Sequence, residues 1–314
     1  MENKKKEISV VIPAFNEAQN LENLTFQLQN TFEKSKYKDL YEIVIINDGS
    51  TDNSEEIGKY ICNKYRNLTF LNLKENIGKA YSLDTGIYFS QGKIIATMDA
   101  DLQYKPEDLV RMIDLIYLNK DIVNGKREKR KDEFITKIFS QLYNSILRIL
   151  FRVKLNDFFC GIKVFKKEIY DLMEYSGLSR FVIFFSKKYN FNIGEVEIEH
   201  AKRTKGKTAY SFFDRIILAF KDIFTLFVCI ALEKKGVYQI KQLILIVYFF
   251  LTMGLVFGKF FLGNNVSNYL FYLITSFFMF LILNFIIQSF LKSKEKSSFN
   301  LKRNIKTIEK SKFK

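Results

Sequence analysis

Short apolar runs separated by longer amphipathic stretches make up the N-terminal part of the chain. The runs are Ile8–Ile12, Ile43–Ile46, Leu68–Leu71, Ile94–Met98 and Ile122–Val123. This alternation predicts an α/β fold: a mostly parallel sheet with helices on both faces. Pro106, followed by Glu107 and Asp108, marks a helix start, because proline fits the first helical position and acids favour the positive end of the helix dipole.

Three polar segments follow apolar runs of this predicted sheet: Pro13–Glu17, Asn47–Asp52 and Asp99–Gln103. In parallel sheets covered by helices, ligands bind at the carboxyl ends of the strands. Asp99 and Asp101 place two carboxylates one residue apart at such an end, and hard oxygen ligands suit Mg²⁺ or Mn²⁺ bridging linked phosphates. An acidic pair alone is weak evidence for a metal site, since such pairs are common at solvated turns, so this motif needs its context.

The C-terminal part contains two long apolar stretches, Gln239–Leu262 and Tyr269–Leu291. Each reaches the roughly 20 residues that cross a bilayer and is apolar around its whole circumference. We predict two transmembrane helices; the alternative is a pair of buried soluble helices. Lys and Arg residues flank both stretches on their outer sides, which predicts a multi-pass protein of the cell membrane with both termini in the cytoplasm.

These patterns divide the chain into four parts. We expect residues 1–210 to form a cytoplasmic domain that carries the three polar segments, 211–235 an amphipathic juxtamembrane segment, 236–291 the two transmembrane helices and 292–314 a basic cytoplasmic tail. Within the first part, 134–153 is apolar on one side, as expected either for a helix on the bilayer surface or for a core helix.

Composition adds a net charge of +15 to this picture. The excess lies in clusters beside the predicted membrane segments and in the tail, where anionic lipid explains it better than nucleic acid, and no nucleic-acid motif is present. The three cysteines, Cys62, Cys160 and Cys229, have no metal or redox spacing and are expected to be reduced thiols.

Four motifs in order give the chain a family resemblance: Val10–Glu17, Asn47–Asp52, Asn76–Lys79 and Asp99–Gln103. The chain resembles family 2 glycosyltransferases of the GT-A fold, and among them the polyprenyl-phosphate glycosyltransferases, which include dolichyl-phosphate mannose synthase and bacterial undecaprenyl-phosphate enzymes. The resemblance continues through Asp157–Gly161, Arg180-Phe181 and His200–Tyr210 and ends in the two-helix anchor. It implies a Rossmann-like GT-A sheet followed by interfacial helices and a transmembrane hairpin.

The resemblance also assigns roles to single residues. It implies that a nucleotide-sugar pocket is lined by Pro13, Phe15, Glu17, Asp48, Asp99 and Gln103. Asp99, Asp101 and Gln103 would surround Mg²⁺ or Mn²⁺ and the diphosphate. Arg127 and Arg203 would face phosphates, so that the catalytic set is Asp99, Asp101, Arg127 and Arg203. Lys79 is expected either to contact a phosphate or to be a solvated helix residue.

Two departures from the family pattern concern the same pocket. Asn47 stands where the family often has a second aspartate, and Ala209 replaces the usual lysine in Gly206–Tyr210. Lys207 is the candidate substitute on the acceptor side. Taken singly, Glu17 as a helix cap and Asp48 in an ordinary turn are the simpler interpretations, and His200 is expected to order a loop rather than to act as a base.

The expected reaction is inverting transfer of a hexose from a UDP- or GDP-linked sugar to polyprenyl phosphate, for cell-envelope glycan or glycosylation pathways. A composition rich in Lys, Asn, Ile and Phe favours a bacterial source and hence undecaprenyl phosphate. A phosphate acceptor is largely deprotonated at neutral pH, so no side-chain base is needed. The alternatives are transfer to a saccharide or lipid hydroxyl and a non-catalytic, sugar-nucleotide-binding assembly subunit. A homo-oligomer is compatible with the sequence.

Overall fold

The structure is a computed structural model, and it describes residues 6–128, 141, 144–145, 147–148, 153, 155–173 and 181–201. These residues build a seven-stranded sheet in the order β3-β2-β1-β4-β6-β5-β7. The strands are β1 (Ile8–Ala14), β2 (Tyr41–Asn47), β3 (Leu68–Asn72), β4 (Ile94–Thr97), β5 (Ile122–Glu128), β6 (Lys163–Lys166) and β7 (Ile193–Glu199). The predicted α/β class, with a mostly parallel sheet, is confirmed.

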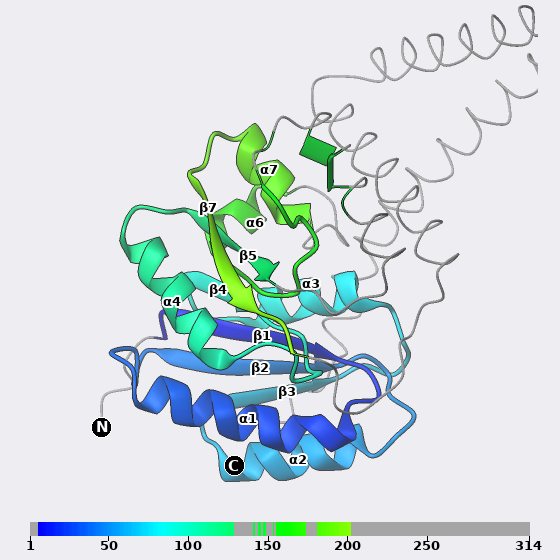
Figure 1. Ribbon diagram of the computed structural model, residues 1–314. Helices are drawn as coiled ribbons and strands as arrows, with labels where there is room; N and C mark the ends of the chain where they lie inside the picture. The colour runs from blue at the N-terminus through cyan, green and yellow to red at the C-terminus, as the bar shows by residue number, and fades with distance from the viewer. Residues whose placement is uncertain are drawn as a thin grey trace, which may run out of the picture. The chain divides into compact units, whose positions relative to one another are not determined.

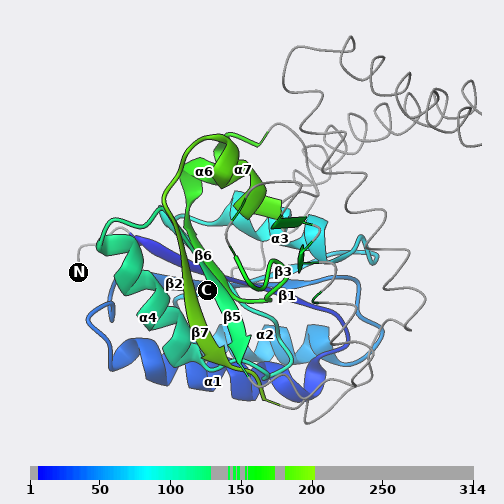
Figure 2. The same cartoon turned by 45° about the horizontal axis from the view of Figure 1, so that its top comes forward.

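One strand departs from the parallel arrangement. β6 pairs antiparallel with both β4 and β5, so it lies between two strands that run in the opposite direction. Figure 2 shows β6 beside β5. Sequence analysis predicted no strand here, because β6 has only four residues and carries lysine at both ends. Because Lys163 stands opposite Thr97, the residues that precede β6, including Gly161, lie beside Asp99 at the end of β4.

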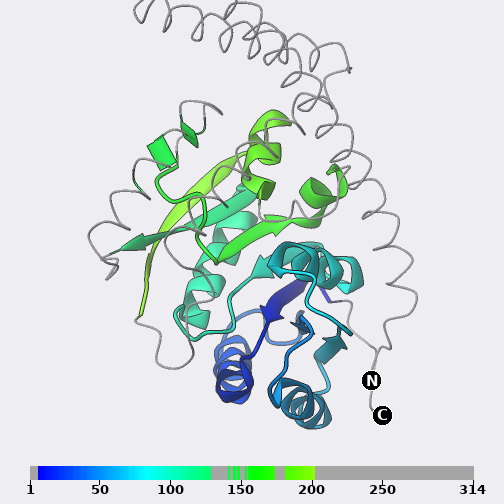
Figure 3. The same ribbon diagram turned by 90° about the vertical axis from the view of Figure 1, so that its right-hand side faces the viewer.

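Helices cover both faces of the sheet. The helices are α1 (Ala18–Glu33), α2 (Ser54–Lys64), α3 (Lys79–Phe89), α4 (Pro106–Tyr117), α6 (Lys167–Asp171) and α7 (Val182–Lys188). Apolar side chains of α1, α2 and α4 join one core with the strands. α3 packs on the opposite face, where Gly86 lies against Val11 and Ile46, and Figure 3 shows α3 across the sheet from α1 and α2. α4 begins at Pro106, as predicted.

Burial on both faces explains the apolar runs seen in the sequence. All seven residues of β2 are buried, and β1 is buried except at Pro13. A strand covered on both sides reads as a continuous apolar run rather than an alternating one. β5 extends well beyond the predicted Ile122–Val123, because its register with β7 continues to Glu128.

The parallel strands β1, β2 and β4 end at the same edge of the sheet (Figure 1). β1 and β2 are paired in register up to Ala14 and Asn47, and the Asp48 amide donates to the Ala14 carbonyl 2.8 Å away. β4 ends two residues before Asp99. The three polar segments therefore meet at the carboxyl edge, as the sequence predicts.

Several sequence predictions fall outside the described residues. They include Arg203, Lys207, most of 134–153, the 211–235 segment, both predicted spans and the tail. Within the part of the chain that the structure describes, no helix has the length and apolar character needed to cross a bilayer.

Candidate functional site

Asp99 is the centre of the candidate site. One of its carboxylate oxygens, Oδ1, accepts a hydrogen bond from the Lys79 ammonium group at 2.5 Å. The other, Oδ2, lies so close to Gly161 that a methyl group added to this glycine would be only 2.3 Å from it. Lys79 begins α3 and Gly161 precedes β6, so Asp99 joins three elements that are distant in sequence.

Three cations determine the charge state of Asp99. Burial opposes ionisation of this carboxyl, but Lys79, then Lys163 and Arg127, hold its pKa below the ordinary aspartate value. Asp99 is therefore an anion at neutral pH. Its side chain keeps a quarter of its surface exposed, 25%, which leaves the carboxylate accessible from solvent.

Asp101 and Gln103 lie in a strained turn. Asp101 is buried, and its Oδ1 accepts a hydrogen bond from the Gln103 amide at 3.2 Å. Leu102, between them, has a φ of 59°, a left-handed conformation that is unusual for a bulky residue and that clusters at functional sites. The Gln103 side-chain amide donates to the Ala201 carbonyl at 3.0 Å, which ties this turn to the end of β7.

Arg127 makes a two-pronged ion pair with Asp157. Its Nε and Nη2 atoms donate to the two carboxylate oxygens at 2.6 and 2.9 Å. Both side chains are nearly buried, with 14% and 8% exposed. Burial alone disfavours the cation, but Asp157 outweighs it and raises the pKa of Arg127, whose charge is compensated by this partner. Arg127 thus anchors the turn that leads to Gly161.

Sequence analysis missed the polar contacts that join the ends of β1 and β2. Asn16 has a left-handed φ of 57°, and its Oδ1 accepts the Thr51 amide at 2.8 Å. The Asn16 amide in turn donates to the Ser50 hydroxyl at 2.8 Å. Asp52 accepts the Ala18 amide at 3.1 Å, at the start of α1. An asparagine between a strand and a helix was the available signal, since Asn tolerates this conformation.

Asp48 fixes the segment that precedes α3. Its two carboxylate oxygens accept the Ile77 and Gly78 amides at 2.8 and 3.0 Å, and the residue is buried. Gly49 beside it has a φ of 63° and no room for a side chain, because a methyl group would lie 2.3 Å from the Glu75 carbonyl carbon. The turn places Lys79 next to Asp99.

The remaining predicted pocket residues lie at the end of β1. Pro13 is half-buried, and Phe15 is 41% exposed at the sheet edge. Glu17 occupies the cap position of α1, but its side chain makes no capping bond and instead accepts the Asn20 amide group at 2.5 Å. Asn47 is buried and donates to Asn72 Oδ1 at 2.7 Å.

His200, the only histidine, ends the β7 region and contacts Tyr104 edge to face, with ring centroids 5.2 Å apart. The Tyr104 hydroxyl accepts the Gly161 amide at 3.1 Å. Burial raises the pKa of Tyr104 well above its ordinary value, so this hydroxyl stays protonated. This arrangement agrees with the predicted loop-ordering role of His200.

The Asp99 and Asp101 carboxylates suit a hard divalent cation that takes its remaining ligands from the phosphates of a bound substrate and from water. In the described residues, no group of three or more His, Cys, Asp or Glu side chains gathers as a closed metal site. Mg²⁺ and Mn²⁺ are often held by one or two carboxylates together with phosphate oxygens and water. Asp99, which is accessible, anionic and paired with Lys79, has the chemistry required.

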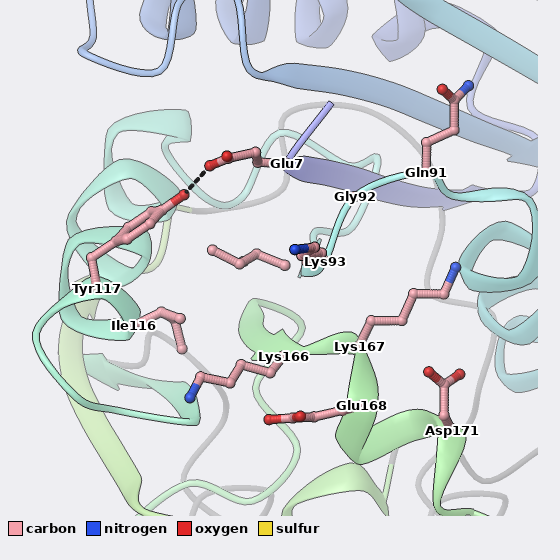
Figure 4. Close-up of a pocket in the computed structure, with 11 residues that line it drawn as sticks. Glu7, Gln91, Gly92, Lys93, Ile116, Tyr117, Lys166, Lys167, Glu168 and Asp171 are labelled. Atoms are coloured by element: carbon pink, nitrogen blue, oxygen red, sulfur yellow. Dashed lines mark hydrogen bonds between the residues drawn. The ribbon is translucent and has the colours of Figure 1, made fainter. Parts of the chain in front are cut away.

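A cavity of about 720 Å³ lies elsewhere, at the amino ends of β1 and β4. Figure 4 shows its lining, where the Tyr117 hydroxyl donates to Glu7 at 2.8 Å. Lys166 and Lys167 also line it, and their ammonium groups are bonded to Asp121 and to the Ser90 carbonyl. None of the four sequence motifs contributes a residue to this lining, so we place the candidate site at the opposite edge, with Asp99.

Comparisons with solved structures show the fold. Glucosyl-3-phosphoglycerate synthase from Mycobacterium tuberculosis, crystallised with Mn²⁺, UDP-glucose and phosphoglyceric acid, aligns with a TM-score of 0.55 at 16% identity. The alignment covers 71% of this chain and 79% of that one. The same enzyme with Mg²⁺ and UDP aligns with a TM-score of 0.54.

The curated relatives are enzymes whose names combine a polyprenyl phosphate with a sugar. Undecaprenyl-phosphate 4-deoxy-4-formamido-L-arabinose transferase of Proteus mirabilis is 29% identical over 216 residues, 68% of this chain and 65% of the relative. Thus the chain matches slightly less than two thirds of that relative's length. Dodecaprenyl-phosphate galacturonate synthase of Rhizobium johnstonii is 28% identical over 278 residues, covering 83% of this chain and 79% of the relative.

The family model for glycosyl transferase family 2 matches residues 9–174, more than half of the chain. This segment contains β1 except for Ile8, the strands β2 to β6, and the candidate residues from Pro13 to Arg127. The resemblance drawn from the sequence motifs is confirmed: the chain belongs to glycosyl transferase family 2.

Proposed function

We propose that this protein transfers a hexose, with inversion, from a nucleoside diphosphate sugar to a polyprenyl phosphate at the cytoplasmic face of a membrane. The observation that carries the proposal is Asp99, an accessible anion at the carboxyl edge of the sheet, held among the cations Lys79, Lys163 and Arg127. The lysine and arginine side chains of this cluster suit anionic substrates, and the Asp99 carboxylate suits a divalent cation. The names of the curated relatives point to the same acceptor class.

Asp99 and Asp101 are the proposed metal ligands, with Gln103 beside them. A bound Mg²⁺ or Mn²⁺ would neutralise the departing nucleoside diphosphate. Lys79 lies at the first position of α3, where the positive end of the helix dipole also favours phosphate. Pro13, Phe15, Glu17 and Asp48 are the proposed nucleotide side of the pocket.

The reaction needs no general base from the chain. An oxygen of the acceptor phosphate attacks the anomeric carbon, the bond from that carbon to the donor diphosphate breaks, and the diphosphate leaves with the electron pair. The acceptor is already an anion at neutral pH, so no proton has to be removed. The task of the protein is to hold two anions together, for which we propose Lys79, Arg127, Arg203 and Lys207.

Membrane attachment brings the acceptor to this site. We propose that the two apolar stretches in 236–291 span the bilayer and that 211–235 lies at its surface. A polyprenyl tail then stays in the lipid while its phosphate reaches the domain. A homo-oligomer remains compatible with this arrangement.

The test uses washed membranes containing the full-length chain, labelled UDP- and GDP-sugars, and undecaprenyl phosphate. Label should enter the lipid extract only with Mg²⁺ or Mn²⁺ and be lost on chelation. Asp101→Asn should lower turnover about a hundredfold or more, because it removes a charged ligand. Asp121→Asn, at the other edge beside Lys166, is the matched control and should keep normal turnover.

Other outcomes would decide against the proposal. Label found only in a saccharide or in a lipid without phosphate would indicate a hydroxyl acceptor. Sugar-nucleotide binding without any transfer would indicate an assembly subunit. Normal turnover in Asp101→Asn would remove the assignment of the metal site.

A further inference from the structure

Lys163 is a buried cation without a carboxylate partner. It is the first residue of β6, an inner strand of the sheet, and only 6% of its surface is exposed. Its ammonium group donates to the Cys160 carbonyl. Among the described residues, no carboxylate lies within ion-pair distance of it, whereas Lys79 and Arg127 are paired with Asp99 and Asp157.

The strand register surrounds Lys163 with other polar groups. Lys163 stands opposite Thr97 of β4 and opposite Asn124 of β5, and directly opposed residues project from the same face of a sheet. Asn124 is fully buried, and its amide group donates to the Gly125 and Asp157 carbonyls at 2.8 and 2.7 Å. Its Oδ1 atom has no hydrogen-bond partner in the described structure.

The burial of the Lys163 ammonium group without a carboxylate partner lowers the stability of the fold. A buried ammonium group loses its hydration, and replacing buried charge with an apolar side chain of similar volume is often stabilising. Burial lowers the pKa of Lys163 to about 8, the direction expected from that loss. A local feature that works against stability beside a candidate site indicates a role in the site.

The position of Lys163 indicates which role. Its ammonium group holds the carbonyl of Cys160, whose neighbour Gly161 packs against Asp99 Oδ2. Lys163 also acts on Asp99 through its charge, since it helps to keep that carboxyl ionised. In surroundings of low dielectric constant, a fixed charge acts over longer distances than in water.

We propose that Lys163 is a positioning residue of the glycosyl transfer: beside Asp99 it places a positive charge that has no ion-pair partner among the described residues, and this charge favours binding of the anionic donor and acceptor. This inference rests on the function proposed above, which requires a diphosphate and a phosphate monoester to meet at one edge of the sheet. The bound metal and Lys163 then share the task of offsetting their charge.

The test measures binding to the full-length protein purified in detergent. The variants are Lys163→Met, Lys163→Arg and the control Lys166→Met, which removes a lysine of the same strand that is paired with Asp121. Titrations measure the affinity for UDP and for GDP with Mn²⁺ present, and the affinity for Mn²⁺ alone. Lys163→Met should weaken nucleotide binding about tenfold, while Mn²⁺ alone binds as tightly as before or more tightly, because a repelling cation is gone.

Thermal unfolding separates this role from a merely structural one. Lys163→Met should unfold at the same temperature as the unchanged protein or a few degrees higher. Lys163→Arg should keep nucleotide affinity within about threefold, since it keeps the charge. Lys166→Met should leave nucleotide affinity unchanged.

Three results would overturn the inference: unchanged nucleotide affinity in Lys163→Met, joint loss of nucleotide and Mn²⁺ binding with a lower unfolding temperature, or failure of Lys163→Met to fold. If the unchanged protein binds neither nucleotide and makes no glycolipid, the proposed function itself fails, and the inference fails with it.

Discussion

At the scale of single residues, the site depends on the close contacts that Lys79 and Gly161 make with the Asp99 carboxylate. Lys79 and Gly161 contact its two oxygens from different elements, and the contact with Gly161 leaves no space for a side chain. Leu102, in a left-handed conformation, holds the following turn in a shape that most side chains avoid. The geometry of the carboxylate is therefore fixed by its neighbours in space.

Gly161→Ala should reduce turnover by about ten- to a hundredfold. The added methyl carbon would lie 2.3 Å from Asp99 Oδ2 and must displace the carboxylate, and small misplacements of reacting groups have effects of this size. Steady-state assays of lipid-linked product measure the effect. Gly194→Ala is the matched control, because the methyl carbon added there would lie 3.4 Å from its nearest neighbour, Lys120, which is an ordinary van der Waals contact. Equal turnover in both variants would contradict the prediction.

The stability of the protein should rise with pH because of Lys163. Its folded pKa is about 8, below the ordinary lysine value of 10.5, so between these values the unfolded chain binds more protons than the folded one. The cost of burying this charge is present in full below pH 8 and disappears as pH rises towards 10.5, by roughly 3 kcal/mol at most.

The measurement compares thermal unfolding of the unchanged protein with that of Lys163→Met from pH 7 to pH 10. The variant should be the more stable at pH 7, and the difference should shrink steadily at higher pH. The charged and titratable groups that act on Lys163 are Lys79, Asp99, Asp157 and Cys160. A difference that does not change with pH would show that Lys163 does not titrate in this range.

At the scale of elements, the loops at the carboxyl edge are held by side chains rather than by strand pairing. Asn16 joins the loop after β1 to the loop after β2, and Asp48 joins the latter to the segment before α3. Gln103 and Ala201 join the Asp101 turn to the end of β7. Each loop that carries a candidate residue is thus fixed by a second loop.

Asp48→Asn should loosen the start of α3. The amide group offers a donor where two backbone amides, of Ile77 and Gly78, need acceptors, and one unsatisfied buried group costs about 1–3 kcal/mol. We expect a lower unfolding temperature and faster amide exchange at residues 77 and 78. The exposed Asp171, changed to Asn, is the control. Unchanged exchange in Asp48→Asn would contradict the assignment.

Most of these elements, but not all, were predictable from the sequence. Apolar runs indicated β1 to β4, because strands buried on both faces are locally distinct, and Pro106 indicated the start of α4. β6 was not predictable, because its pairing depends on β4 and β5 rather than on its own four residues. The contact of Gly161 with Asp99 and the role of Lys163 were missed for the same reason, because both residues reach Asp99 only through that pairing.

At the scale of the whole molecule, the family match and the sheet account for the N-terminal part of the chain, and the proposed membrane segments rest on hydropathy alone. Asp99 and Asp101 were predictable because a short local motif carries them. Asp157 was noted as part of a motif, but its pairing with Arg127 had no local signal, because an ion pair between residues 30 positions apart is set by the fold. Arg203 and Lys207 lie outside the described residues and stay predictions.

Alkaline carbonate washing tests the two proposed membrane spans. The full-length chain should stay in the membrane pellet, because two stretches of about 20 apolar residues each resist extraction, whereas peripheral binding through basic clusters does not survive high pH. A variant that ends at residue 235 lacks both stretches but keeps the proposed surface segment, so it should bind membranes at neutral pH and be released by carbonate. Release of the full-length chain would contradict the two spans and would leave the catalytic domain to meet its lipid acceptor by surface binding alone.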